Sequence, residues 1–186
     1  MAEHIVGLKR TDYCAELGEA DIGRTCTVMG WCHKSRDLGG LTFITLRDRT
    51  GEIQLVVSPE SNEDVRSKAS RVRSEFVLAC KGLISRRSAP NANMKTGQIE
   101  VIVEELRILS EAQTPPFYIE EGVEANEALR LKYRYLDLRR PDMQRNMMLR
   151  HRIAKCARDF FDNQGFVEIE TPMLGKSTPE GARDYL

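Results

Sequence analysis

The stretch LTFITLRDRTGEIQLVV, residues 41–57, decides the fold. Two runs in it, 41–47 and 52–57, alternate apolar with polar residues, which is typical of strands with one buried face. Between the runs stands Asp48-Arg-Thr-Gly51, a turn sequence. The stretch therefore predicts a β-hairpin with a four-residue loop.

The loop length also predicts which side chains share a face of the hairpin. It places Thr45 opposite Gln54 and Phe43 opposite Val56, and directly opposed residues share a face. Phe43, Thr45 and Gln54 then lie on one face. The other face, which we expect to form the core, carries Ile44, Leu46, Ile53 and Leu55. An aromatic ring one diagonal step from an amide can stack on a base and read its Watson–Crick edge.

The elements around the hairpin predict a small barrel. We expect an arm with one short helix over 1–24, strands over 25–33, 76–84 and 98–109, a turn at 37–40, and a helix over 61–72 with Val65, Ala69 and Val72 on one side. The resulting order, β-β-β-α-β-β, is that of the OB-fold. This five-stranded, partly open Greek-key barrel uses its second and third strands to bind oligonucleotides.

Basic residues flank the predicted Phe43 face. The first strand ends beside His33, Lys34 and Arg36, and the fourth ends at Arg86 and Arg87. Basic groups around an exposed aromatic ring indicate a groove for single-stranded RNA. A second interpretation remains open, in which Phe43 packs under a loop, Gln54 is a solvated strand residue and the charges form a solvated rim. Glu100, on the fifth strand, is either a surface carboxylate or an acceptor for a base amino group.

The C-terminal part predicts a linker and one long helix. Residues 113–141 form the linker or hinge, whose segment 127–140 is rich in Arg and Tyr and has helical spacing at Leu129, Tyr133 and Leu136. We interpret this segment as a helix with a charged outer face, interrupted at Pro141, and contact with an RNA backbone is the second possibility. A helix over 143–164 carries an apolar stripe, Gly165 is placed to cap it, and a strand over 166–172 ends at Pro172.

Composition limits the classes of function. Lys plus Arg equals Asp plus Glu at 28 each, so any nucleic-acid site must be local. Five widely spaced cysteines without a CxxC pair indicate buried thiols in a reducing compartment rather than a zinc site. No targeting segment or apolar run long enough to span a membrane is present, so we expect a cytoplasmic protein with no membrane partner. The residues offer no metal site and no catalytic residue.

Four sequence segments carry a family resemblance. The helix followed by residues 165–172 resembles motif 1 of the class II aminoacyl-tRNA synthetases, and the upstream OB module narrows this to the aspartyl, asparaginyl and lysyl subclass. Residues 30–39, 134–141 and 178–186 then resemble the bacterial-type aspartyl-tRNA synthetase family. The resemblance implies three parts. Residues 1–112 form an OB-fold anticodon-binding domain that includes the N-terminal arm, residues 113–141 form the hinge, and residues 142–186 form the start of the class II catalytic domain.

The resemblance also implies roles for particular residues. The anticodon contacts of the family fall on Arg36, Phe43, Gln54, Arg87 and Glu100. Phe43 would stack on the middle uracil of the anticodon while Gln54 and the neighbouring charges read base edges. Ser85 stands where some relatives have a second Arg, which weakens the expected fourth-strand contact. Pro172 would be the motif 1 proline of the dimer interface, and Glu180 would reach the ammonium group of bound aspartate.

For an intact family member the resemblance implies attachment of L-aspartate to tRNA with ATP and Mg²⁺, through aspartyl-adenylate, by a homodimer. The arginines that would serve that chemistry belong to motifs 2 and 3, which are not in these 186 residues. We therefore expect no cofactor site and no aminoacylation by this chain alone. The alternative function is a free-standing tRNA- or RNA-binding OB-fold protein without catalytic activity. A lysyl or asparaginyl relative is a further alternative, which residues 134–141 and 178–186 disfavour.

Overall fold

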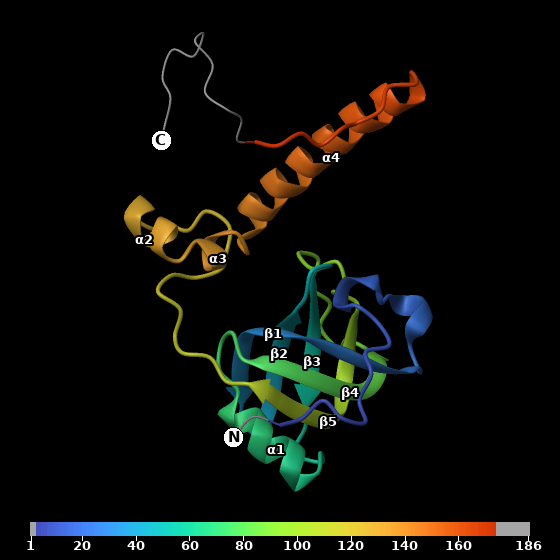
Figure 1. Ribbon diagram of the computed structural model, residues 1–186. Coiled ribbons are helices and arrows are strands. Elements are labelled where there is room, and N and C mark those ends of the chain that lie inside the picture. Colours follow the sequence, from blue (N-terminus) through green and yellow to red (C-terminus); the bar gives the residue numbers. More distant parts are fainter. Residues whose placement is uncertain (1–2, 174–186) are drawn as a thin grey trace, which may run out of the picture. The chain divides into compact units, whose positions relative to one another are not determined.

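The computed structural model describes residues 3–173, and the chain divides after Pro115 into two compact units. The first, residues 3–115, is called the barrel unit here. The second, described over 116–173, is called the helical unit, and each is described by itself (Figure 1).

The barrel unit contains five strands and one α-helix in the predicted order. The elements are β1 Thr25–Leu38, β2 Leu41–Arg47, β3 Glu52–Val57, α1 Glu63–Arg71, β4 Val77–Arg86 and β5 Ile99–Ser110. They close into a barrel in the order β1-β2-β3-β5-β4, with β3 and β5 parallel and every other pair antiparallel. The OB-fold prediction is confirmed.

The hairpin has the predicted register. Thr45 lies opposite Gln54, and Phe43 lies opposite Val56. The four residues assigned to the core, Ile44, Leu46, Ile53 and Leu55, are each 0% exposed. On the other face Phe43, Thr45 and Gln54 remain partly exposed. The Phe43 ring is therefore neither sealed in the core nor fully exposed.

The first strand is longer than predicted and serves both neighbours. Its N-terminal half pairs with β4 and its C-terminal half with β2, up to Leu38 opposite Leu41. Two glycines allow backbones to approach closely: a Cβ on Gly30 would lie 2.3 Å from the Arg47 carbonyl oxygen, and one on Gly82 would lie 2.2 Å from that of Ile102. A β-bulge at Cys32/Lys34 leaves His33 without an opposite residue on β2.

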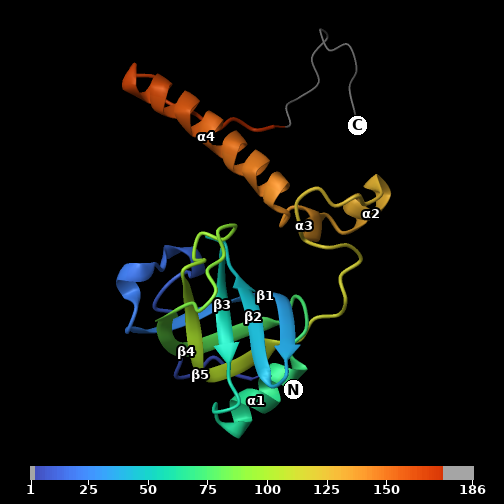
Figure 2. The same cartoon turned by 180° about the vertical axis from the view of Figure 1, so that it is seen from behind.

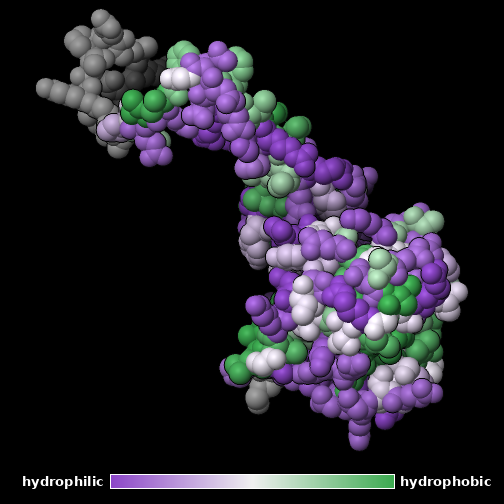
Figure 3. Space-filling model, turned by 90° about the vertical axis from the view of Figure 1, so that its right-hand side faces the viewer, coloured by the Kyte–Doolittle hydropathy of each residue, from purple (hydrophilic) through white to green (hydrophobic). Residues whose placement is uncertain are grey.

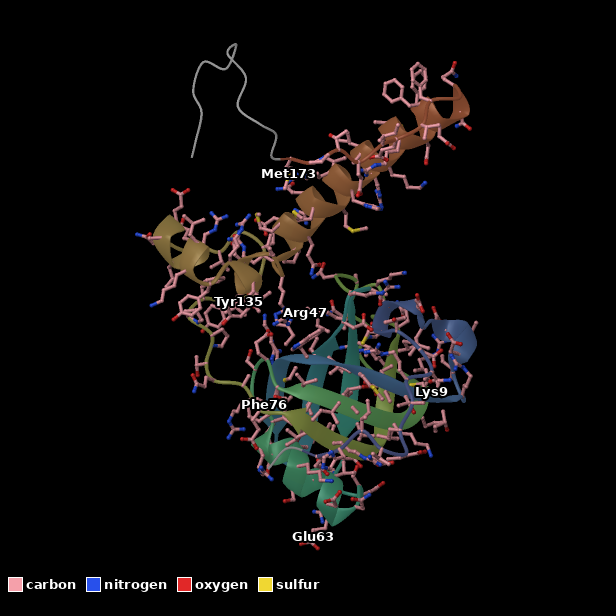
Figure 4. All side chains as sticks on the ribbon, viewed as in Figure 1. Lys9, Arg47, Glu63, Phe76, Tyr135 and Met173 are labelled. Atoms are coloured by element: carbon pink, nitrogen blue, oxygen red, sulfur yellow. The ribbon has the colours of Figure 1, made fainter. Side chains whose placement is uncertain are left out.

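The helix α1 lies across one end of the barrel, and Glu63 marks its first turn (Figures 1 and 4). Asn62 caps it, because its side-chain oxygen accepts a hydrogen bond from the Val65 amide at 2.8 Å. Val65, Ala69 and Val72 are at most 2% exposed, so the predicted apolar side is confirmed.

The arm before β1 is more ordered than one short helix. It contains two 3₁₀ turns, Cys14–Glu16 and Glu19–Asp21. The Cys14 amide donates to Asp48 at 2.7 Å and the Ala15 amide to Thr50 at 2.9 Å, so the arm is tied to the hairpin loop. Burial would raise the pKa of Asp48, but the hydrogen bonds that it accepts from the Cys14 amide and from Thr50 lower it overall. Cys14 and Leu17 join the barrel core.

In the helical unit the single helix expected over 127–140 is broken. The structure has α2 Glu127–Lys132 and α3 Arg134–Asp137, separated at Tyr133, whose φ of −111° and ψ of 45° are not helical. Asp137 is 0% exposed and accepts hydrogen bonds from Arg130 at 2.9 Å, from Arg140 at 3.2 Å, and from Arg134. Three of the arginines considered for RNA contact thus bind one buried carboxylate.

The last helix, α4 Pro141–Asn163, begins two residues earlier than predicted. Pro141 starts this helix at its N1 position, where the missing N–H costs no hydrogen bond. Gly165 ends it as predicted, with φ of +82°; its amide donates to Asp162, and the Phe166 amide donates to Phe161 at 3.1 Å. The rings of Phe161 and Phe166 pack with centroids 5.6 Å apart, which completes a Schellman motif.

Two further expectations for this unit are wrong. Residues 166–172 form no strand, because no other described segment pairs with their backbone. Cys156 is exposed, whereas Cys14, Cys26, Cys32 and Cys80 are buried thiols as predicted. The apolar stripe on α4 that includes Leu149, Ile153 and Phe160 is also exposed within the described chain. Figure 3 shows such hydrophobic groups spaced along this unit.

Candidate nucleic-acid interface

A groove of about 420 Å³ opens on the outer face of the β2–β3 hairpin. Strands β1, β2 and β3, which form its floor, lie side by side in Figure 2. The loop between β4 and β5 forms one wall. The groove is lined by His33, Lys34, Arg36, Leu38, Phe43, Thr45, Glu52, Gln54, Arg87, Ser88, Ala89, Asn91, Asn93, Met94 and Glu100.

All five residues predicted for the anticodon site line this groove. Arg36 lies directly opposite Phe43 across the β1–β2 pairing, which places a guanidinium-bearing residue beside the ring. Gln54 is on β3 and Glu100 is on β5, which are neighbouring strands. Arg87 follows the end of β4. Strands β1, β2, β3 and β5, with the residue that follows β4, therefore bring the five side chains together.

Gln54 is held in one orientation by Glu100. The Gln54 Nε2 group donates to the Glu100 Oε2 atom at 2.8 Å. An ionised carboxylate only accepts hydrogen bonds, so the amide nitrogen, not the amide oxygen, must face it. The Gln54 oxygen is then left as an acceptor for a ligand group. Glu100 is thus a partner of Gln54 rather than a solvated surface carboxylate.

Arg87 is positioned by the loop that follows β4. Its amide donates to the Gln98 carbonyl at 2.9 Å, and its guanidinium contacts the Met94 sulfur at 3.7 Å. Within residues 3–173 the Arg87 Nε atom is buried and has no hydrogen-bond partner. A buried donor without a partner is costly, so an acceptor supplied by a ligand would be favourable here.

Arg86 does not join the groove, contrary to expectation. Its guanidinium pairs with Glu19 of the arm at 2.8 Å, and it is not among the lining residues. Arg86 is the last residue of β4, and Arg87 follows the end of that strand. Of the basic groups predicted around the hairpin face, His33, Lys34, Arg36 and Arg87 line the groove.

The structure adds groove residues that the sequence pattern did not identify. Asn91, Asn93 and Met94 come from the β4–β5 loop, which is anchored to β3 where the buried Thr96 hydroxyl donates to the Glu52 carbonyl at 2.7 Å. Polar loop residues give no periodic signal, so only tertiary structure places them.

Glu52 also lines the groove and pairs with His33. Glu52 lies opposite Arg47 in the hairpin, but the sequence did not predict its pairing with His33, because the β1 bulge displaces His33. Burial would raise the pKa of Glu52, but the hydrogen bond and charge of His33, with smaller effects of Arg47 and Lys34, lower it overall. The Glu52 side chain is therefore ionised near neutral pH.

Residues 3–173 contain neither a group of side chains arranged for a metal ion nor a helix suited to span a membrane. Among residues 3–173 no three His, Cys, Asp or Glu side chains are arranged to hold a metal ion. No helix in that range has both the length and the apolar character needed to cross a membrane.

Two family models match the chain. Residues 26–109 match a model described as the OB-fold nucleic acid binding domain, and residues 126–186 match tRNA synthetases class II (D, K and N). Asparaginyl-tRNA synthetase from Pyrococcus horikoshii, solved with asparaginyl-adenylate, aligns with a TM-score of 0.80 and 26% identity over 94% of this chain and 39% of that one. The two matches place an OB-fold nucleic acid binding domain ahead of a region similar to class II tRNA synthetases.

Curated relatives narrow this similarity. An aspartate–tRNA ligase from Ruminiclostridium cellulolyticum is 59% identical over 100% of this chain and 32% of its own length. One from Clostridium botulinum is 55% identical over 100% of this chain and 31% of its own. The whole of this chain is therefore similar to aspartate–tRNA ligases, and it spans about a third of the length of these relatives.

Two residues with predicted roles, Pro172 and Glu180, lie near the C-terminus. Pro172 is exposed and follows the extended segment after α4. Glu180 and the string 178–186 lie outside the described residues.

Proposed function

We propose that the groove of the barrel unit binds the anticodon loop of aspartate tRNA. The observation that carries the proposal is the meeting of Arg36, Phe43, Gln54, Arg87 and Glu100 in one groove. A partly exposed ring beside a fixed amide suits unpaired bases, because every base has a face to stack and an edge to read.

Each residue has a distinct part in this proposal. Phe43 stacks on the middle uracil of the anticodon. Gln54, oriented by Glu100, offers its oxygen and its remaining N–H to a base edge. Arg36 and Arg87 line the groove and supply positive charge for base and phosphate oxygens.

We further propose that the whole protein attaches L-aspartate to tRNA in the cytoplasm, with ATP and Mg²⁺. A carboxylate oxygen of aspartate attacks the α-phosphorus of ATP, and pyrophosphate leaves. A hydroxyl of the terminal adenosine of tRNA then attacks the carbonyl carbon, and AMP leaves. The similarity of the whole chain to aspartate–tRNA ligases supports this proposal.

Two assignments outside the barrel complete the proposal. The exposed apolar stripe of α4 and Pro172 belong to a homodimer interface, which would bury side chains such as Leu149, Ile153 and Phe160. Glu180 contacts the ammonium group of aspartate.

Fluorescence anisotropy with labelled anticodon stem-loops tests the anticodon proposal. The chain is titrated against loops with aspartate, asparagine and lysine anticodons on one common stem. Tightest binding to the aspartate loop is expected. Preference for the lysine or asparagine loop would refute the assignment of the tRNA, and equal binding of all three would refute reading of the anticodon.

A further inference from the structure

His33 and Glu52 form an ion pair inside the groove that none of the proposed anticodon contacts uses. The His33 Nδ1 atom is hydrogen-bonded to the Glu52 Oε1 atom. Both residues line the groove, and their side chains are 18% and 31% exposed. The bulge in β1 brings His33 to this position, since it is the extra residue between Cys32 and Lys34.

The chemistry of the pair fixes which imidazole nitrogen titrates. Glu52 is an ionised acceptor, so Nδ1 must carry a hydrogen in both the charged and the neutral forms of His33. The proton that comes and goes is therefore the one on Nε2. Losing it removes a positive charge from the groove while the hydrogen bond to Glu52 can persist.

Neighbouring charges do not replace that of His33. Lys34 follows it on β1, and Arg47 on β2 is already paired with Glu75 at 2.7 Å (Figure 4). Among the described lining residues the fixed cations are Lys34, Arg36 and Arg87, and the carboxylates are Glu52 and Glu100. Only His33 changes its charge near neutral pH by its ordinary chemistry.

We propose that protonated His33 is a positioning residue for RNA binding: it holds Glu52 and cancels the carboxylate's charge where the polyanion must pass. This inference rests on the proposed RNA-binding function of the groove. When His33 is neutral, the charge of Glu52 is offset only by the smaller effects of Arg47 and Lys34, so the carboxylate repels phosphates more strongly. The affinity of the groove for the aspartate anticodon loop then falls as the pH rises through the titration of His33.

The test is a set of anisotropy titrations of the full chain between about pH 5 and about pH 8 at fixed salt. Wild type is expected to bind the aspartate stem-loop about two- to fivefold more weakly at the upper pH than at the lower pH. This is the change expected when one partly exposed charge interaction is lost. His33→Asn keeps an N–H donor near the position of Nδ1 but has no charge. It should bind at every pH as wild type does at the upper end.

Glu52→Gln supplies an independent variant. It removes the repelling carboxylate, so at about pH 8 it should bind as tightly as wild type does at about pH 5. A pH profile of His33→Asn as steep as that of wild type would overturn the inference. So would weakened binding by Glu52→Gln at the upper pH, with cooperative thermal unfolding showing that the variant is folded.

An NMR titration of the His33 imidazole gives a readout that a purely structural role would not move. Bound RNA should raise the pKa of His33 above its value in the free chain, because proton and RNA binding are linked. An unchanged pKa would contradict the proposal. If wild type binds no stem-loop at any pH, the proposed function fails; if it binds through Phe43 with a flat pH profile, only the present inference fails.

Discussion

Phe43→Ala removes the ring that we propose stacks on the middle base of the anticodon. The ring lies on the outer face of β2, directly opposite Arg36 on β1 and Val56 on β3. The core beneath it is made by Ile44 and Leu46, both 0% exposed. The substitution should therefore remove a ligand contact and leave the barrel closed.

The expected loss follows from the energy of one base stack. Removing an aromatic platform costs about 1 to 3 kcal/mol of binding free energy, or about five- to 150-fold in Kd. Because the ring is partly exposed, the free energy of unfolding should fall by less than about 2 kcal/mol, below the cost of emptying a core site. Phe43→Leu, which keeps apolar volume but lacks the aromatic face, should lose most of the same affinity.

The assay is anisotropy with the aspartate anticodon stem-loop, beside thermal unfolding of each variant. Unchanged affinity in a folded Phe43→Ala protein would refute stacking on this ring. Full affinity in Phe43→Leu would show that apolar contact, rather than the π face, holds the base.

Three further changes test other parts of the structure. Glu100→Gln frees the Gln54 amide to rotate. The difference in binding free energy between the aspartate loop and a loop with one base changed should fall by about 1 to 3 kcal/mol. The same difference in the variant as in wild type would contradict the orienting role of Glu100. Gly82→Ala puts a Cβ 2.2 Å from the Ile102 oxygen and should destabilise the barrel by about 1 to 3 kcal/mol in denaturant unfolding, whereas Gly18→Ala, with nothing within 4 Å, should be nearly neutral. The hydrogen bond from Arg130 is the largest cause that lowers the pKa of Asp137; burial opposes it, and the charges of Arg130, Arg134 and Arg140 add to it. The ionised Asp137 side chain therefore stabilises the folded state above the unfolded pKa of about 3.9. That stabilisation is lost as the pH falls through the lower pKa of the folded state. Hydrogen exchange in α3 should accelerate over that acid range in wild type and already at neutral pH in Asp137→Asn.

The sequence predicted the parts of the site that local rules determine. A four-residue loop and a period of two fix the hairpin register, so the shared face of Phe43, Thr45 and Gln54 followed before any tertiary information. The apolar side of α1 and the Gly165 cap likewise depend on spacing within one element. The family resemblance, rather than periodicity, selected Arg87 over Arg86 and assigned Glu100 to the site.

The features that were missed depend on partners distant in the sequence. The bulge at His33 inserts one residue into β1 and breaks the alternation from which side-chain direction would be predicted. Arg86 and Arg87 look equivalent in the sequence, but Arg86 pairs with Glu19 of the arm. Residues 166–172 alternate like a strand, yet a strand needs a neighbour, and no described segment supplies one.

Photocrosslinking tests most directly whether this groove holds the anticodon. The middle uridine of the aspartate stem-loop is replaced by 4-thiouridine, irradiated with the chain, and the crosslinked peptides are identified by mass spectrometry. We predict crosslinks within β2 or β3, at or beside Phe43 and Gln54. Crosslinks confined to α1, the N-terminal arm or the helical unit would contradict the account.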